Sequence, residues 1–120
     1  MDDLVEYNRG DGAKIIFDKR TYFEIALSCL EKFANKSRID AEQILKEGFF
    51  HDDTFPPRSY NEVALLDNEL IYDVSMMSLY GDRYWENTNY KPIPMDEYYD
   101  WEDAIISEKQ LNSNYFEYIE

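Results

Sequence analysis

Cysteine and histidine are nearly absent from this chain, whose 120 residues contain one of each, Cys29 and His51. A single cysteine can form neither an internal disulfide nor a thiolate zinc centre, and a single histidine leaves a histidine-based metal site short of ligands. The four glycines form neither a phosphate-binding loop nor a dinucleotide-binding fingerprint. We therefore expect no metal ion and no cofactor, and we expect that the protein is not an enzyme.

Basic residues are also scarce, because only 12 lysines and arginines accompany 26 aspartates and glutamates. The formal net charge is −14 and the pI is about 4.3. This charge repels the phosphates of DNA and RNA and the surface of an anionic membrane, so we expect no direct binding to either. The partner that the composition favours is a basic protein.

Long apolar runs are missing as well, and the acidic N-terminus lacks the features of a signal peptide. Together with the lone cysteine, this predicts a cytoplasmic protein in a reducing compartment.

Core-forming side chains, in contrast, are plentiful. Hydrophobic residues make up 44% of the chain and aromatic residues 17%, which argues against a disordered acidic tail. A chain of this length buries enough surface to fold without a metal or a disulfide. We expect residues 1–120 to form a single acidic globular domain.

The spacing of apolar residues predicts a mainly α fold of about four helices. Ser37 and Ser59 each stand three residues before an acidic side chain, which is typical of a capped helix start. The expected helices cover residues 18–35, 38–49, 60–80 with a break near 67–68, and 96–109, the last capped by Asp96. A long loop is expected at 82–94. Residues 13–17 and 115–119 have the composition of short strands and are expected to pair as a minor two-stranded β element.

The negative charge is concentrated in the second half of the chain. Residues 1–60 carry 12 acidic and 9 basic side chains, whereas residues 61–120 carry 14 acidic and 3 basic ones. Acidity that served solubility alone could be spread evenly, since a net charge of about 2 to 8 in magnitude suffices for a small domain. The asymmetry therefore indicates a surface for a cationic partner.

The densest acidic stretch is 96–103, where no lysine or arginine occurs from residue 92 to residue 108. Two sets of side chains fall on opposite faces of a helix here, with Asp96, Asp100 and Asp103 on one face and Tyr98, Trp101 and Ile105 on the other. Each pair of neighbouring like charges costs about 0.2 to 0.5 kcal/mol. A cationic partner would explain this unrelieved row; the alternative is that acidic residues simply stabilise the start of a helix.

Tyrosine and tryptophan are frequent anchors at protein interfaces, and they are equally ordinary core residues. We interpret Tyr98 and Trp101 as core and assign other aromatic residues of this region to the interface. The expected partner-binding residues are Asp82, Tyr84, Trp85, Glu86, Tyr90, Asp96, Tyr99, Asp100 and Asp103.

Catalytic alternatives have weaker support. His51 stands beside Asp52 and Asp53, but a lone histidine in a loop is usually solvated. A dyad with Cys29 conflicts with the place of that cysteine on an apolar helix face, where it acts as a small hydrophobe. Pairs of carboxylates are too common in this chain to indicate a particular acid–base or cation site.

These observations favour an acidic inhibitor that binds and blocks a basic protein. The leading hypothesis is an immunity protein or antitoxin that neutralises a nuclease toxin, because a nuclease presents a positive cleft and opposite fields accelerate encounter. The first alternative is a phage anti-defence protein, anti-restriction or anti-CRISPR, whose carboxylates imitate the phosphates of DNA. The second alternative is a non-catalytic structural or adaptor domain.

Overall fold

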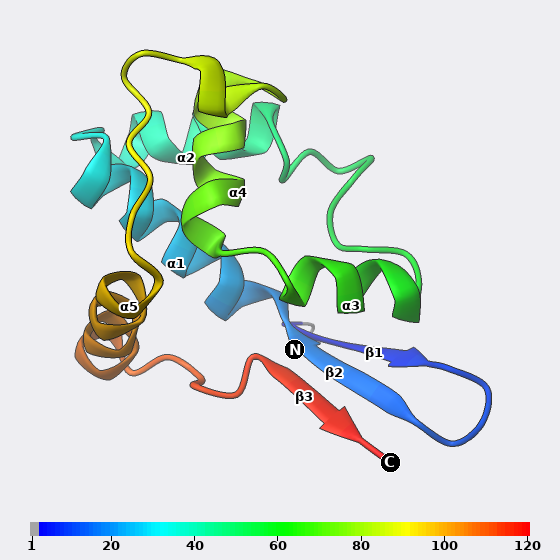
Figure 1. Ribbon diagram of the computed structural model, residues 1–120. Coiled ribbons are helices and arrows are strands. Elements are labelled where there is room, and N and C mark those ends of the chain that lie inside the picture. Colours follow the sequence, from blue (N-terminus) through cyan, green and yellow to red (C-terminus); the bar gives the residue numbers. More distant parts are fainter. Residues whose placement is uncertain (1–2) are drawn as a thin grey trace.

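The protein is a mainly helical domain with one small sheet, as the computed structural model of residues 3–120 shows (Figure 1). The expected fold class is confirmed. Along the chain, the elements of the described residues are β1 (Leu4–Asn8), β2 (Lys14–Asp18), α1 (Lys19–Phe33), α2 (Arg38–Glu47), α3 (Tyr60–Asp67), α4 (Ile71–Tyr80), the 3-10 turn η1 (Tyr84–Glu86), α5 (Met95–Lys109) and β3 (Phe116–Ile119).

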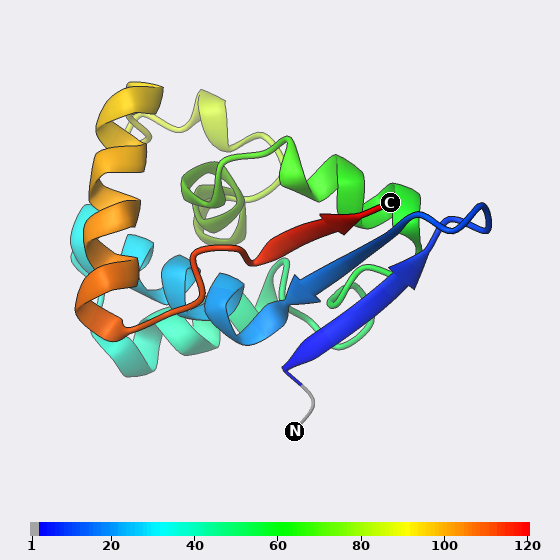
Figure 2. The ribbon, with the colours of Figure 1, turned by 90° about the horizontal axis from the view of Figure 1, so that it is seen from below.

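The sheet is antiparallel with strand order β1-β2-β3 (Figure 2). The expected pairing of its second and last strands is confirmed, with Phe17 opposite Phe116. The expectation of only two strands was wrong, because the polar N-terminal segment forms β1, in which Val5 faces Phe17. Alternation explains the error: Val5 and Tyr7 turn towards the protein while their neighbours are exposed, so the segment reads as polar overall.

Two helix starts follow the capping expected from the sequence. The side chains of Ser37 and Ser59 accept hydrogen bonds from backbone N–H groups three residues on, and Asp18 caps α1 in the same way. The prediction that Asp96 caps α5 was wrong, because that helix begins at Met95 with Pro94 in the N-cap position. A proline fits the start of a helix, because the backbone N–H groups there need no intrahelical partner. Helix α5 therefore begins earlier along the chain than Asp96 indicates.

The predicted break in the third helix is present and separates two distinct helices. Residues 68–70, which lie between them, are not helical. Helix α4 ends at Tyr80, and the next residue, Gly81, has a φ of 95°, which only glycine adopts readily. The break lets α3 rest against the sheet through Val63 while α4 packs across α1. Residues 3–120 form five α-helices, where four were expected.

Helix α1 runs through the centre of the core and is contacted by α2, α4 and α5. Tyr22, Ile25 and Leu30 on this helix are fully buried. Trp101 of α5 packs edge-on against Phe33, with ring centroids 5.1 Å apart, which supports its assignment to the core. None of the helices formed by residues 3–120 combines the length and the apolar character that crossing a bilayer requires.

Glu102 is a buried carboxylate in this mainly apolar interior, with only 5% of its surface exposed. Its Oε1 accepts hydrogen bonds from the hydroxyls of Tyr98 at 2.7 Å and Tyr115 at 2.9 Å. No lysine or arginine among residues 3–120 lies within ion-pair distance of it. Burial raises the pKa of Glu102 above its ordinary value of 4.5, although the two hydrogen bonds act in the opposite direction.

A close approach also joins α2 to α4. A Cβ added to Gly48 would lie 2.8 Å from the Cβ of Ser78, nearer than real side-chain contacts come. The adjacent Phe49 donates its backbone N–H to the hydroxyl of Ser78 at 3.1 Å. Glycine is therefore required here because of packing.

We predict that Gly48→Ala lowers the free energy of unfolding by about 1 to 3 kcal/mol, since α2 and α4 must move apart to accept the methyl group. Urea unfolding followed by circular dichroism measures this change. Stability equal to that of the unmodified protein would contradict the close packing of the two helices.

We predict that Glu102→Gln raises the free energy of unfolding at pH 7, because the neutral amide can accept the same two hydrogen bonds without a buried charge. Between the pKa of an unfolded glutamate and the raised native pKa, the native protein holds a proton that the unfolded chain has released. The contribution of Glu102 to the free energy of unfolding therefore falls as pH rises through that interval. Below the interval, E102Q is expected to have no higher free energy of unfolding than the unmodified protein.

Urea unfolding at a series of pH values between 4 and 8 tests this prediction. Glu108→Gln removes one carboxylate from an exposed position of the same helix and serves as the control. Parallel stability curves for E102Q and the unmodified protein would contradict the prediction.

Candidate functional site

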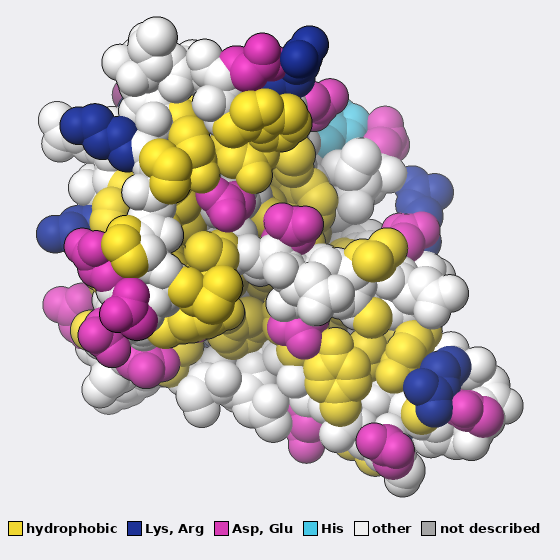
Figure 3. Space-filling model, in the orientation of Figure 1, with side chains coloured by type: hydrophobic (Ala, Val, Ile, Leu, Met, Phe, Trp, Pro, Cys, Tyr) yellow, Lys and Arg dark blue, Asp and Glu magenta, His cyan; other side chains and the backbone are white. Residues whose placement is uncertain are grey.

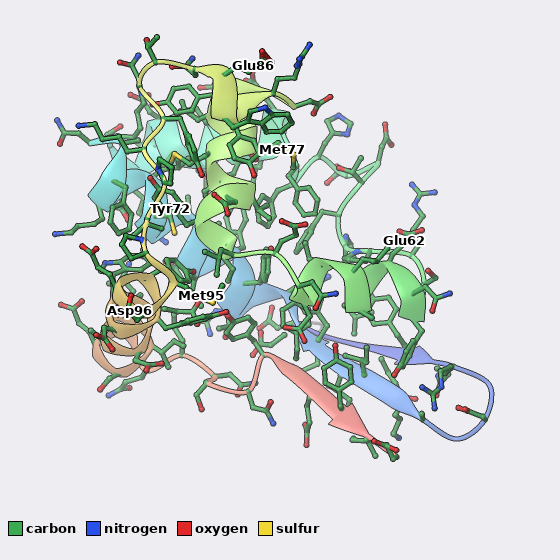
Figure 4. All side chains as sticks on the ribbon, in the orientation of Figure 1. Glu62, Tyr72, Met77, Glu86, Met95 and Asp96 are labelled. Carbon is green, nitrogen blue, oxygen red and sulfur yellow. The ribbon has the colours of Figure 1, made fainter. Side chains whose placement is uncertain are left out.

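The nine residues expected to bind a partner fall into two groups in the structure. Asp96, Tyr99, Asp100 and Asp103 lie on α5, and the other five lie in the segment from Asp82 to Tyr90 that contains η1. Figure 4 shows Asp96 and Glu86 at different ends of the same face of the molecule. The nine predicted residues therefore lie on two surfaces and do not form one continuous site.

The acidic face of α5 has the arrangement predicted from helical spacing. Asp96, Asp100 and Asp103 are exposed, while Tyr98 on the opposite face is fully buried. None of the three aspartates forms an ion pair with a lysine or arginine of residues 3–120. The nearby Tyr99 is 44% exposed and is the one aromatic side chain that accompanies this row at the surface.

The segment around η1 is held to α4 by its tyrosines. Tyr84 and Tyr90 are half-buried with ring centroids 5.1 Å apart, and the hydroxyl of Tyr90 donates to Oδ1 of Asp73 at 2.9 Å. Burial and this hydrogen bond raise the pKa of the Tyr90 phenol. The two side chains thus fix the position of the segment, and Tyr84 also lines one of the cavities described below.

Of the remaining residues in this segment, Trp85 is 59% exposed, which suits an anchor. Glu86 forms an ion pair with Arg83 at the molecular surface. Asp82 is exposed and has no ion pair with the described part of the chain. Trp85 and Asp82 are therefore the members of the expected site that remain available at this end of the molecule.

These two residues line a larger feature that sequence reasoning did not find. Two adjoining cavities of about 300 and 280 Å³ share Phe49, Leu66 and Glu69 in their walls. We call the two together the acidic groove. Its apolar lining includes Phe49, Leu65, Leu66, Met77 and Trp85, and its carboxylates are Glu62, Glu69, Asp73 and Asp82.

No lysine or arginine among the described residues lines the acidic groove. Figure 3 shows hydrophobic and acidic side chains gathered on this face, with lysine and arginine at its periphery. Figure 4 places Met77 of α4 between Glu62 of α3 and Glu86 of η1. The groove therefore lies between α3 and η1, with α4 along its floor.

The sequence did contain a signal for this groove. Residues 59–82 include no lysine or arginine, yet they carry Glu62, Glu69, Asp73 and Asp82. The signal was missed because these carboxylates are spread over two helices and a turn, whereas the row on α5 is dense and local. Only the packing of α3, α4 and η1 brings them together.

The catalytic alternatives find no common site. Cys29 is fully buried, and burial raises the pKa of its thiol, so it stays protonated at neutral pH. His51 is exposed, and its Nδ1 accepts a hydrogen bond from the backbone of Asp53 at 3.1 Å. Within residues 3–120, no three or more histidine, cysteine, aspartate or glutamate side chains are arranged to hold a metal ion.

Two substitutions separate an anchor from a structural residue in the η1 segment. We predict that Trp85→Ala changes the free energy of unfolding by less than about 0.5 kcal/mol, because the side chain is mostly exposed. Tyr84→Ala should cost about 2 kcal/mol, because its ring packs against Tyr90 and α4. Urea unfolding measures both values. Equal costs for the two variants would contradict the assignment of Trp85 to a free surface.

Comparison with known proteins gives no family for this chain, since no family model, no curated protein and no solved structure matches it.

Proposed function

We propose that the protein is an inhibitor that binds and blocks a basic protein through the acidic groove, and that it acts as an immunity protein or antitoxin against a nuclease toxin. The observation that carries this proposal is the combination in one groove of four carboxylates, an apolar lining and no cation among the described residues. A surface that only kept the protein in solution would have no need of the exposed apolar side chains.

The carboxylates would act on the rate and the specificity of binding. A net charge of −14 attracts a basic partner over a distance, and the groove concentrates unpaired negative charge where the partner docks. Steering of this kind raises association rates towards 10⁸ to 10⁹ M⁻¹s⁻¹ at low salt. A nuclease is a suitable target because its positive cleft is shaped for phosphates, and a filled cleft cannot bind substrate.

The apolar lining would supply the part of the affinity that does not depend on salt. Leu65 is 67% exposed and Trp85 is 59% exposed, and both line the groove. Aromatic side chains that become desolvated at the centre of an interface commonly dominate its binding energy. A phosphate backbone offers no counterpart to such a lining, which favours a protein-specific interface over simple imitation of DNA.

The alternative, a phage anti-defence protein that imitates DNA towards a restriction or CRISPR effector, would use a different surface. Its contact would be the exposed row of Asp96, Asp100 and Asp103 on α5, which resembles a line of backbone charges and has no ion pairs within residues 3–120. The two proposals can therefore be separated by where charge reversal has its effect.

Two double variants with the same change in net charge make this test. Glu69→Lys with Asp82→Lys alters the acidic groove, and Asp100→Lys with Asp103→Lys alters the α5 row; each pair shifts the net charge by the same amount. We predict that the groove variant slows association with the target nuclease by about tenfold or more at low salt, and that the α5 variant slows it by less than about twofold.

The assay uses purified nuclease toxins from the source cell and its competitors. Cleavage of RNA or DNA is measured with and without the protein, and association rates are measured by stopped flow at several salt concentrations. A larger effect of the α5 variant would support DNA imitation instead. Failure to inhibit any nuclease or nucleic-acid-binding effector would leave a structural or adaptor role and overturn the inhibitor proposal.

A further inference from the structure

A cavity of about 450 Å³ lies outside the acidic groove and shares no lining residue with it. It is formed where the start of α1, the end of α2 and residues 50–56 meet, and we call it the α1–α2 cavity. Its volume falls within the range of pockets that hold small molecules, about 300 to 1,000 Å³.

Three phenylalanines, whose rings are tilted relative to one another, give this cavity an apolar wall. The rings of Phe50 and Phe55 have centroids 4.6 Å apart, and those of Phe23 and Phe50 are 5.1 Å apart. All three residues line the cavity. Clustered rings of this kind suit a planar apolar group, which can stack on one ring or meet another edge-on.

The same cavity collects positive charge in a strongly acidic protein. Lys19, Arg20 and Lys46 line it, although the chain has only 12 lysines and arginines and they are outnumbered more than two to one by carboxylates. Lys19 and Arg20 are the first two residues of α1, whose first turn contains no acidic residue. The carboxylate of Asp18 caps this end of the helix, so the positive charge at the site comes from the lysine and arginine side chains themselves.

His51 adds a hydrogen-bond donor to these cations. Because Nδ1 of this histidine accepts from the backbone N–H of Asp53, the neutral ring carries its proton on Nε2. The carboxylates of Asp3 and Asp52, which also line the cavity, can accept hydrogen bonds from hydroxyl or amino groups. The wall thus offers partners for an anion, a flat ring and polar donors.

The charge of the whole protein does not prevent an anion from binding here. At physiological ionic strength, exposed charges more than about 8 Å apart are largely screened from each other. An anion in the α1–α2 cavity is therefore governed by the charges that line it, three cations against the carboxylates of Asp3 and Asp52, more than by the distant carboxylates of the groove and α5.

We propose that the α1–α2 cavity binds a small organic anion that combines a phosphate or carboxylate with a flat ring and hydroxyl or amino donors, the chemistry of a nucleoside monophosphate. The cations and His51 hold the anionic group, the phenylalanines hold the ring, and Asp3 or Asp52 accepts from a hydroxyl. This binding does not depend on the inhibitor function proposed above.

The single histidine of the chain makes a direct test possible. The imidazole proton signals of His51 are observed by NMR while AMP, GMP, CMP or UMP is added to the full-length protein. We expect a saturable shift with at least one nucleotide, and binding about tenfold or more weaker for the matching nucleoside and for inorganic phosphate, because each supplies only part of the contacts. No saturable shift with any of the four nucleotides would overturn the proposal.

Two charge reversals on α1 separate a built site from general surface charge. Arg20→Glu places a carboxylate at the cavity, whereas Lys32→Glu makes the same change in charge at an exposed position that does not line it. We expect R20E to weaken nucleotide binding by about tenfold or more and K32E to change it by less than about twofold. Equal weakening by the two variants would overturn the proposal.

Discussion

The packing of α4 across the buried helix α1 is the contact on which the rest of the structure depends. Tyr22, Ile25 and Leu30 fill the interior from α1, and α4 covers them with Ile71, Val74 and Met76. Once α4 lies there, α3 must turn back towards the sheet and the segment after Gly81 must cross its end. The hydrophobic effect thus determines where the acidic groove opens, although the groove itself is defined by its charges.

The second constraint is the scarcity of cations. With 12 basic residues for 26 acidic ones, the chain cannot neutralise every face. Apart from Arg83–Glu86 in the η1 segment, the ion pairs between lysine or arginine and a carboxylate in the described residues involve α1, α2 or the β1–β2 hairpin. Glu24, for example, is within ion-pair distance of both Arg38 and Lys109. The acidic groove and the outer face of α5 are left with carboxylates alone. A partner that supplies the missing positive charge would relieve their mutual repulsion, which is the physical basis of the inhibitor proposal.

Local patterns determined most of what the sequence could predict. The helix caps at Ser37 and Ser59 and the interior position of Tyr98 depend on residues close in sequence, and they were predicted. The pairing of β2 with β3 was predicted from the strand-like composition of the two segments. Strand β1 was missed because its three exposed residues, Leu4, Glu6 and Asn8, outnumber its two inward side chains. The acidic groove could not be assembled from the sequence, since Phe49, Glu69 and Trp85 come from three separate segments whose contact depends on tertiary packing. The burial of Glu102 was not predicted either, because its hydrogen-bond partner Tyr115 lies outside α5, in the segment that precedes β3.

Carboxylate footprinting of the complex with a captured nuclease tests the central claim most directly. Exposed carboxylates are coupled to an amine with a carbodiimide, and mass spectrometry gives the extent of labelling at each residue in the free and bound protein. The inhibitor account predicts that Glu69 and Asp82 become protected in the complex while Asp100 and Asp103 are labelled as in the free protein. Protection of the α5 aspartates with unchanged labelling in the groove would contradict it.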